Sequence, residues 1–336
     1  MSDSTDDVTS ILSVQYTVIF SIATLSAIYF VYGLYVLLFG AAVYLMRSRQ
    51  QRNERLNWNL YLSLTVILFV FSTVYVVIET VSLVRDSIIR FTAVKTRDYE
   101  PLVDYWTHDG YKTASVAFVL LIPIILNITA EAMLIHRCYL IWSSSKRVGL
   151  PLVVASVLTN IIGVVDAVLI LVDINSESSN LDSDNVGKAV GVVYGTTSVI
   201  VNSVLTLLTA GRIWWIHRQV RAHGVHTSDK LMHSVSRIIL ESGLLYPAMS
   251  MINLITFYTA TIDDLPLDFG PLVTLSAGIA PTLIMVRARL GKSVESLQDK
   301  VSDIRFTSQP RLQEGTITIS RAQVHSTIAI MEVDSG

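Results

Sequence analysis

Seven long apolar runs constrain the fold of this chain more than any other feature of its sequence. Each run is at least about 20 residues long, the length that an α-helix needs to cross the hydrocarbon core of a membrane. Helices are expected because they satisfy every backbone hydrogen bond internally where water is absent, and the alternation of a membrane β-barrel is missing. The sequence therefore predicts an all-α polytopic membrane protein, a bundle of seven transmembrane helices. The predicted spans are about 20–46, 58–84, 113–142, 150–173, 189–216, 234–260 and 269–289.

The composition also points to lipid as the main environment. Of the 336 residues, 51% are hydrophobic and 15% are charged, whereas soluble domains carry about 25% charged residues. The single cysteine, Cys138, excludes an internal disulfide. The opening MSDSTDDVTS is polar and acidic, so we expect no cleaved signal peptide, which would begin with a basic segment.

The distribution of lysine and arginine predicts the orientation of the bundle. Six of these 25 residues lie on the side that holds the amino terminus and the connections 85–112, 173–188 and 261–268, and nineteen lie on the opposite side. Cytoplasmic connections are the ones enriched in lysine and arginine. We therefore expect the amino terminus outside and the carboxyl terminus inside.

Four segments follow from this topology. Residues 1–19 are expected to form a short acidic extracellular amino terminus, and 20–289 the membrane domain. Residues 290–306 predict an amphipathic helix on the inner membrane surface, with a helix packed on a partner or a coiled-coil fragment as alternatives. Residues 307–336 are mostly polar and predict a disordered cytoplasmic tail. The apolar stripe of 290–306 has spacings of 4, 3, 4 and 3 residues: Leu290, Val294, Leu297, Val301 and Ile304.

The connection 85–112 is the longest on the predicted outer side. It mixes charged residues with Tyr99, Tyr105 and Trp106. These aromatic residues are typical of a solvated loop near the membrane interface, and the alternative is a lid or a ligand contact.

Charged residues near the inner ends of the third and sixth spans predict a polar lock. A carboxylate within a span costs about 2.5–3.5 kcal/mol and therefore normally faces the bundle interior with a partner. Glu131 precedes Arg137 in the third span, and Arg237 precedes Glu241 by one helical turn in the sixth. Crossed pairs between these residues would join the two helices and would open with a small helix shift. The alternatives are a fixed bridge, or arginines that reach lipid phosphates while each glutamate bonds within its own helix.

Polar residues in the outer halves of the spans predict a cavity that opens to the outside. Glu79, Asp166 and Asn202 are the candidates to line it, and the two carboxylates would suit a cationic or hydrogen-bonding ligand. The alternatives are close helix packing by small residues and hydrogen bonds to neighbouring hydroxyls. Further small or polar candidates are Thr196, Thr197, Ser198 and Ser276.

Prolines within the spans predict places where helices bend. Pro123, Pro247 and Pro281 fall inside the third, sixth and seventh spans, where each removes a backbone hydrogen bond. Pro247 follows Glu241 by six residues. We expect hinges at Pro247 and Pro281.

Several chemical classes have no support in the sequence. The seventh span contains no lysine for a retinal Schiff base, and four histidines, at 217, 223, 226 and 233, fall in a predicted cytoplasmic connection. Walker A, G-x-S-x-G and H-E-x-x-H motifs are missing, as is a basic domain for nucleic acid. We expect no enzyme activity, no cofactor, no metal site and no nucleic-acid partner.

Three motifs resemble a group of seven-span membrane proteins of mushroom-forming basidiomycete fungi. They are Glu131 followed by the R-C-Y-x-I-W sequence of 137–142, ESGLLY at 241–246, and AGIAPTLIMVRARLGKS at 277–293. The resemblance covers about 20–295 and implies a seven-helix integral membrane protein, but no particular activity. The topology also looks like that of a G-protein-coupled receptor. The chain departs from that pattern, with His136-Arg137-Cys138 at the Asp/Glu-Arg-Tyr triplet and no disulfide cysteine in the third span.

These observations lead to a receptor-like hypothesis. We expect a plasma-membrane protein that senses an extracellular small molecule or peptide and signals to the cytoplasm, through a heterotrimeric G protein or another effector, at 47–57, 137–147 and 212–237. One alternative is a small transporter or channel in which buried carboxylates carry protons or cations. The other is a structural membrane protein without a ligand.

Overall fold

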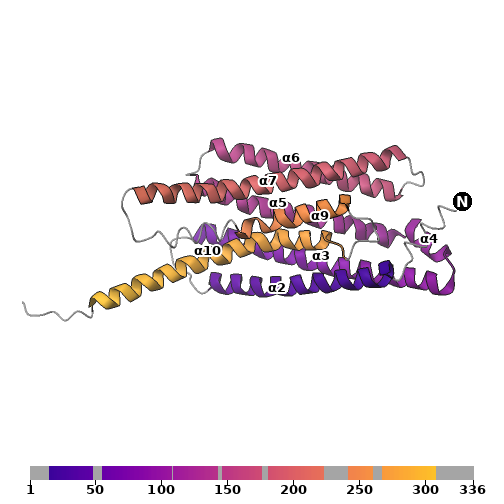
Figure 1. Ribbon diagram of the computed structural model, residues 1–336, viewed down its shortest axis with the longest axis horizontal. Coiled ribbons are helices and arrows are strands. Elements are labelled where there is room, and N and C mark those ends of the chain that lie inside the picture. The colour runs from indigo at the N-terminus through magenta and orange to yellow at the C-terminus, as the bar shows by residue number, and fades with distance from the viewer. Residues whose placement is uncertain are drawn as a thin grey trace, which may run out of the picture. The chain divides into compact units, whose positions relative to one another are not determined.

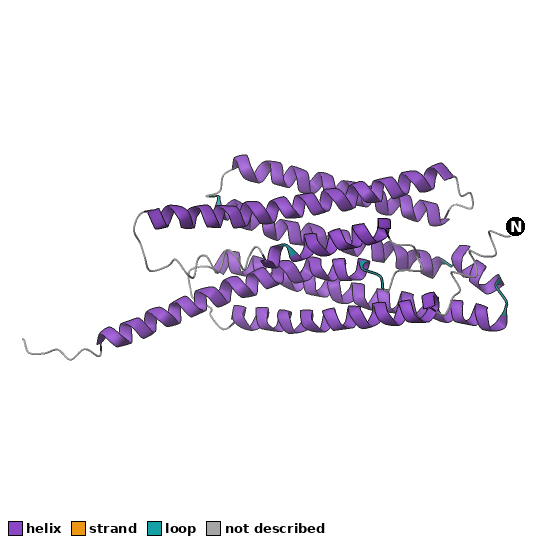
Figure 2. Ribbon diagram, in the orientation of Figure 1, coloured by secondary structure: helices purple, strands orange, loops and turns teal. Residues whose placement is uncertain are grey.

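The structure is a computed structural model that describes residues 15–47, 55–107, 109–142, 146–175, 181–222, 241–259 and 267–307. Within these ranges every regular element is a helix and no strand occurs (Figures 1 and 2). The elements are a π-helical turn η1 (Gln15–Phe20) and the α-helices α2 (Ser21–Arg47), α3 (Arg55–Thr96), α4 (Glu100–Thr107), α5 (Gly110–Ile141), α6 (Lys146–Asn175), α7 (Leu181–Ala222), α9 (Leu245–Thr259) and α10 (Gly270–Thr307).

Six of the described helices are long and apolar enough to cross a membrane, which makes this a membrane-embedded helical protein. The six segments are Val18–Arg47, Asn59–Thr96, Gly110–Ile141, Gly149–Ile174, Val186–Arg212 and Gly270–Arg287. The predicted sixth span, 234–260, is described only over 241–259, and α9 contributes 15 residues of it.

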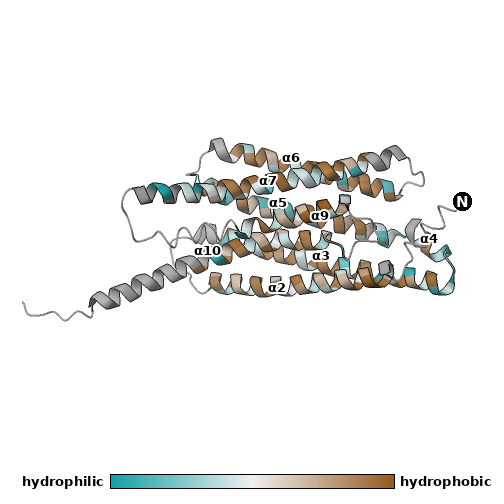
Figure 3. Cartoon of the chain, viewed as in Figure 1, coloured by the Kyte–Doolittle hydropathy of each residue, from teal (hydrophilic) through white to brown (hydrophobic). Residues whose placement is uncertain are grey.

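The outward faces of the helices are apolar, as a lipid environment requires. Phe30, Leu37 and Tyr44 on α2 are 69%, 72% and 70% exposed. Figure 3 shows hydrophobic residues along most of the length of α2, α3, α5 and α6. Apolar surface on this scale is unstable in water, so these faces contact lipid.

The chain divides into two units after Gly291, and the second unit contains the last part of α10. In the first unit α5 is the central helix, and it packs against α3, α6 and α7. Helix α2 lies on α3, and α9 lies on α7. The part of α10 up to Arg287 is the most enclosed of the six apolar segments.

One glycine permits the close approach of α10 to its neighbours. A Cβ atom at Gly278 would lie 2.8 Å from the Tyr35 hydroxyl of α2 and 3.0 Å from the Ser72 hydroxyl of α3. Neither distance leaves room for a side chain at this position. Small residues at such crossings are the usual means by which membrane helices pack.

The connection 85–112 is largely helical, unlike the loop expected from its polar residues. Helix α3 continues to Thr96 because no glycine or proline interrupts it, and the ion pair between Asp86 and Arg90 lies along one face. Arg97 then ends the helix in the left-handed conformation, with φ of 56°. Asp109 caps α5, with its Oδ1 accepting a 2.8 Å hydrogen bond from the Tyr111 N–H.

Candidate functional site

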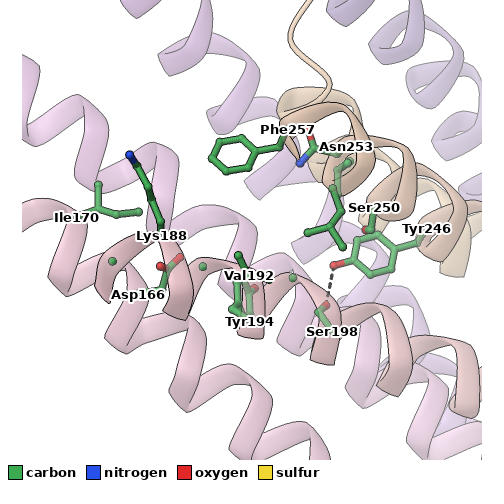
Figure 4. A pocket seen from close by; sticks show the side chains of 15 residues that line it. Asp166, Ile170, Lys188, Val192, Tyr194, Ser198, Tyr246, Ser250, Asn253 and Phe257 are labelled. Atoms are coloured by element: carbon green, nitrogen blue, oxygen red, sulfur yellow. Dashed lines mark hydrogen bonds between the residues drawn. The ribbon is translucent and has the colours of Figure 1, made fainter. Parts of the chain in front are cut away.

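A cavity of about 460 Å³ lies among α6, α7 and α9. Its size falls in the range of small-molecule sites, roughly 300–1,000 Å³. The cavity has two ends, here called the Asp166 end and the Tyr246 end. Figure 4 shows Asp166 and Lys188 at the first end, and Ser198 and Tyr246 at the second. The apolar lining residues are Ile170, Val192, Leu254, Phe257 and Val273.

Three glycines of α7 leave space for this cavity. Gly187, Gly191 and Gly195 are four residues apart and therefore share one face of the helix. A Cβ atom at Gly191 would lie 3.2 Å from Asp166 Oδ1, and one at Gly195 would lie 3.3 Å from Leu254 Cδ1. A Cβ atom at Gly187 would meet nothing within 4 Å. Larger residues at these positions would therefore fill the cavity.

The charged groups of the Asp166 end are not paired with each other. Asp166 Oδ1 is buried and has no hydrogen-bond partner among the described residues. Neither Asp166 nor Lys188 takes part in the ion pairs of the described chain. An enclosed carboxylate oxygen without a donor is energetically unfavourable, so this end of the cavity is suited to a ligand that donates hydrogen bonds.

Hydroxyl groups line the Tyr246 end. The Ser198 and Tyr246 hydroxyls lie 3.1 Å apart and connect α7 to α9. Tyr194 closes the α6 side, where a Cβ atom at Gly163 would lie 2.6 Å from the tyrosine ring. This glycine lets α6 and α7 approach each other beside the cavity.

A buried cluster, here called the polar node, lies next to the cavity. It consists of Asn127 and Glu131 on α5, Ser156 and Asn160 on α6, and Asn202 on α7. Glu131 is fully buried. Its Oε1 accepts from the Asn127 and Asn202 amides at 3.0 and 3.2 Å, and its Oε2 accepts from Ser156 Oγ and the Asn160 amide at 2.5 and 2.8 Å. Four donors therefore solvate one carboxyl group inside the bundle.

One turn of α7 joins the cavity to the polar node. The Asn202 side-chain amide donates to the Ser198 carbonyl at 3.0 Å as well as to Glu131. The Ser198 side chain in turn contacts the Tyr246 hydroxyl in the cavity wall. The path from Tyr246 to Glu131 therefore consists of three consecutive polar contacts: Tyr246 with Ser198, Ser198 with Asn202, and Asn202 with Glu131.

The three residues predicted to line an outer cavity occupy three different places. Asp166 lines the cavity, and Ser198 from the wider set does so as well. Asn202 belongs to the polar node. Glu79 is 8% exposed on α3, and its charged neighbour is Asp268, just before α10. The structure therefore brings Asp166 and Asn202 to adjoining sites and leaves Glu79 in a separate environment.

Asp268 lies in the short segment that precedes α10, outside the apolar spans. Burial raises the pKa of the Asp268 carboxyl, although the Gly270 N–H donates to its Oδ1 at 2.8 Å and acts in the opposite direction. The Asp268 N–H donates to Thr24 Oγ1 at 3.0 Å. These contacts attach the start of α10 to α2.

The four residues of the predicted lock are distributed as follows. Glu131 belongs to the polar node, and the Arg137 guanidinium lies 5.4 Å from the ring centroid of Tyr61 on α3. Glu241 is exposed at the start of the segment 241–243. Arg237 lies outside the described residues, so the lock stays a prediction.

Helix geometry differs at the two predicted hinges. Helix α10 runs through Pro281 without interruption. Before Pro247 the chain turns at Leu244, between the helical residues 241–243 and α9. Pro247 has no N–H for the Gly243 carbonyl, and the Thr206 hydroxyl of α7 donates to that carbonyl at 3.3 Å instead. A neighbouring helix thus satisfies the backbone group that proline releases.

Sequence reasoning missed most members of the polar node. Asn127 precedes Glu131 by four residues and therefore shares its helix face. Asn160 is a polar residue in an apolar run, which was a usable signal. Nothing in the sequence indicates that Ser156 or Tyr246 lies beside these groups.

Among the described residues no group of three or more His, Cys, Asp or Glu side chains is arranged to hold a metal ion. No family model, curated protein or solved structure matches the chain.

Proposed function

We propose that this chain is a receptor-like seven-transmembrane protein of the plasma membrane. Its amino terminus faces outside, and it senses an extracellular small molecule in the cavity beside Asp166. The contact between this cavity and the polar node, through Ser198 and Asn202, is the observation that carries the proposal. The volume of about 460 Å³ favours a small molecule over a peptide.

The proposed topology is supported by charge. Nineteen of the 25 lysines and arginines fall on the predicted inner side. In that orientation the Asp166 end of the cavity is the one nearer the outer surface, because α6 ends at Asn175 and α7 begins at Leu181 on the same side. In this proposal the predicted sixth span, 234–260, which contains α9, completes the seven. The resemblance to seven-span proteins of mushroom-forming basidiomycetes is part of the same proposal.

The proposed signal passes from the cavity to the inner end of α9. A ligand that draws Tyr246 toward α7 displaces the adjoining segment 241–243. The Gly243 carbonyl of that segment is bonded to Thr206, and its Ser242 hydroxyl accepts from the Arg287 guanidinium of α10 at 2.9 Å. In this proposal, ligand binding in the cavity therefore changes the contacts of segment 241–243 with α7 and α10.

The cytoplasmic partner in this proposal is a heterotrimeric G protein or another effector at the basic inner connections 47–57, 137–147 and 212–237. The protein itself is proposed to have no enzyme activity and no cofactor. A lock between Glu131, Arg137, Arg237 and Glu241 remains part of the inactive state in this proposal.

A transporter is the second candidate. Asp166 lines the cavity, and Glu131 is connected to the other end of the cavity through Ser198 and Asn202; carboxylates within a bundle are the groups that a proton or cation path uses. Saturation of Glu131 by four donors argues for a fixed role instead.

The test uses the full chain in lipid nanodiscs with a fluorophore on Leu244→Cys, an exposed position in the turn next to segment 241–243, screened against a collection of small molecules. A ligand should raise the melting temperature and change the emission of the label. Gly187→Leu should abolish both responses because its side chain fills the cavity. The matched control is Gly211→Leu on the same helix, where a Cβ atom also meets nothing within 4 Å, and it should retain both responses.

Two outcomes would reject the receptor. Transport of the ligand into proteoliposomes would make the protein a transporter. Equal ligand responses of the Gly187→Leu and Gly211→Leu variants would show that the ligand does not act through the cavity.

A further inference from the structure

We infer that the cavity takes an amino-acid-like zwitterion with an apolar side chain. Asp166 would bind the ammonium group, Lys188 the carboxylate, and the apolar wall around Leu254 the side chain. This inference rests on the proposed function, because it assigns a ligand class to the same cavity.

The ammonium pole follows from the environment of Asp166. Its Oδ1 is buried without a hydrogen-bond donor among the described residues. The adjacent Gly191 has no side chain to cover it. An ammonium group brings three donors and a compensating charge, and charge-assisted hydrogen bonds are the stronger ones.

The carboxylate pole follows from Lys188 at the same end of the cavity (Figure 4). Lys188 precedes Gly191 by three residues, so it stands about one helical turn from the Asp166 carboxylate along α7. It forms no ion pair within the described chain. One acid and one base at one end of a cavity match the two charges of a zwitterion.

The apolar remainder of the ligand follows from the remaining walls. Val192, Leu254 and Phe257 line the cavity between its two ends together with the polar Ser250 and Asn253, and Gly195 leaves it open. The Ser198 and Tyr246 hydroxyls are already bonded to each other at the far end. An apolar side chain extending from the charged end toward Tyr246 therefore fits these surfaces.

Three probes that share one phenyl group test the two poles separately. They are phenylalanine, phenethylamine, which lacks the carboxylate, and 3-phenylpropionate, which lacks the ammonium. Affinities are measured by calorimetry on the full chain in nanodiscs. Phenylalanine should bind about ten- to a hundredfold more tightly than 3-phenylpropionate, which loses the contact with the enclosed Asp166. It should bind about two- to fivefold more tightly than phenethylamine, which loses only the contact with the exposed Lys188.

Two conservative variants assign the poles. Asp166→Asn should weaken phenylalanine binding about ten- to a hundredfold and should not weaken the binding of 3-phenylpropionate, which has no ammonium group for Asp166. Lys188→Gln should weaken phenylalanine binding only about two- to fivefold, because Lys188 is exposed, and should not weaken phenethylamine binding. Unchanged melting temperatures of the unliganded variants serve as the folding control.

Three results would overturn the inference. In the first, phenethylamine binds as tightly as phenylalanine, and in the second, 3-phenylpropionate binds as tightly as phenylalanine. In the third, phenylalanine does not bind at about 10 mM, which is ten times a weak, millimolar Kd. The proposed function is judged separately. A neutral ligand whose binding is lost in Gly187→Leu and kept in Gly211→Leu would refute the zwitterion and support the receptor cavity.

Discussion

Glu131 shows how a single buried carboxyl group is accommodated without a cation among its described contacts. Its two oxygens receive four hydrogen bonds from three asparagines and a serine on three helices. A carboxylate has about four lone-pair sites, so these donors match its capacity. The polar node therefore depends on all of its members, since a partly satisfied buried network is destabilising.

Removing one donor from the polar node should lower stability. In Asn160→Ala the bonds to Glu131 Oε2 and to the Ser156 carbonyl, both 2.8 Å, are lost. We expect a loss of about 1–3 kcal/mol in the free energy of unfolding, measured by reversible unfolding in mixed micelles. The control is Asn253→Ala, a half-buried asparagine on α9. Equal stability of the two variants would show that the polar node contributes little.

Asp268 predicts a pH dependence of stability. Because burial raises the pKa of this carboxyl in the folded protein, folding favours its protonated form, and stability falls as the pH rises from about 3.9, the ordinary aspartate value, through the raised pKa. Asp268→Asn keeps an acceptor for the Gly270 N–H and removes the charge. Melting temperature followed from about pH 4 to pH 8 should decline less in this variant. Parallel profiles of the wild type and the variant would contradict the prediction.

Among the helices, the break in the chain before α9 depends on residues of both α9 and α7. Pro247 deprives the Gly243 carbonyl of its helical donor, and Thr206 of α7 supplies a substitute at 3.3 Å. The approach is close, since a Cβ atom at Gly243 would lie 2.6 Å from Thr206 Cγ2. The position of the predicted hinge is thus set by a proline in one helix and a hydroxyl in another.

A double-mutant cycle tests this account. Thr206→Val should cost about 0.5–1.5 kcal/mol in the wild-type background, because the Gly243 carbonyl loses its donor. In a Pro247→Ala background the restored N–H of residue 247 can donate to the Gly243 carbonyl. Thr206→Val should therefore lower the free energy of unfolding by less in that background. The unfolding free energies of the four proteins yield the coupling. Additive costs would mean that Thr206 does not replace the missing helical bond.

At the scale of the whole molecule, lipid accounts for the apolar outer faces and charge predicts which end faces the cytoplasm. The described part of the chain contains six helices able to cross a membrane. The membrane crossing of the predicted sixth span, 234–260, and the orientation of the bundle rest on the sequence alone. Both are open to direct measurement, because the native Cys138 is fully buried and contributes little background labelling.

Labelling with a membrane-impermeant thiol reagent should reveal the orientation. Asp98→Cys, between α3 and α4, should react on intact cells. Gln219→Cys, near the other end of the bundle on α7, should react only after permeabilisation. Both positions are exposed. The reverse pattern would place the amino terminus inside and refute the receptor topology.

The helical class and the approximate spans could be predicted because lipid leaves few choices. Helices α2, α5 and α6 begin and end within a few residues of the predicted 20–46, 113–142 and 150–173. The end of α3 was predicted poorly. Hydropathy indicates where the lipid contact ends, whereas a helix continues until a residue such as Arg97 terminates it.

The candidate site was predictable only in part. The cost of burying a carboxylate identified Asp166 and Glu131 from the sequence. It did not identify their neighbours, because these depend on the rotation and depth of separate helices. A rotation of α6 by one residue, about 100°, would take Asn160 away from Glu131.

Continuous apolar runs are enough to specify a helical membrane protein, because lipid admits no other backbone for such runs. The same runs identify the polar side chains that need partners inside the bundle. The identity of those partners depends on how the helices pack. The tertiary structure surrounded Glu131 with amides from α5, α6 and α7, and it left Asp166 facing a cavity beside Lys188. The physical reason is that hydropathy acts on each helix separately, whereas hydrogen bonds and cavities depend on how several helices pack together.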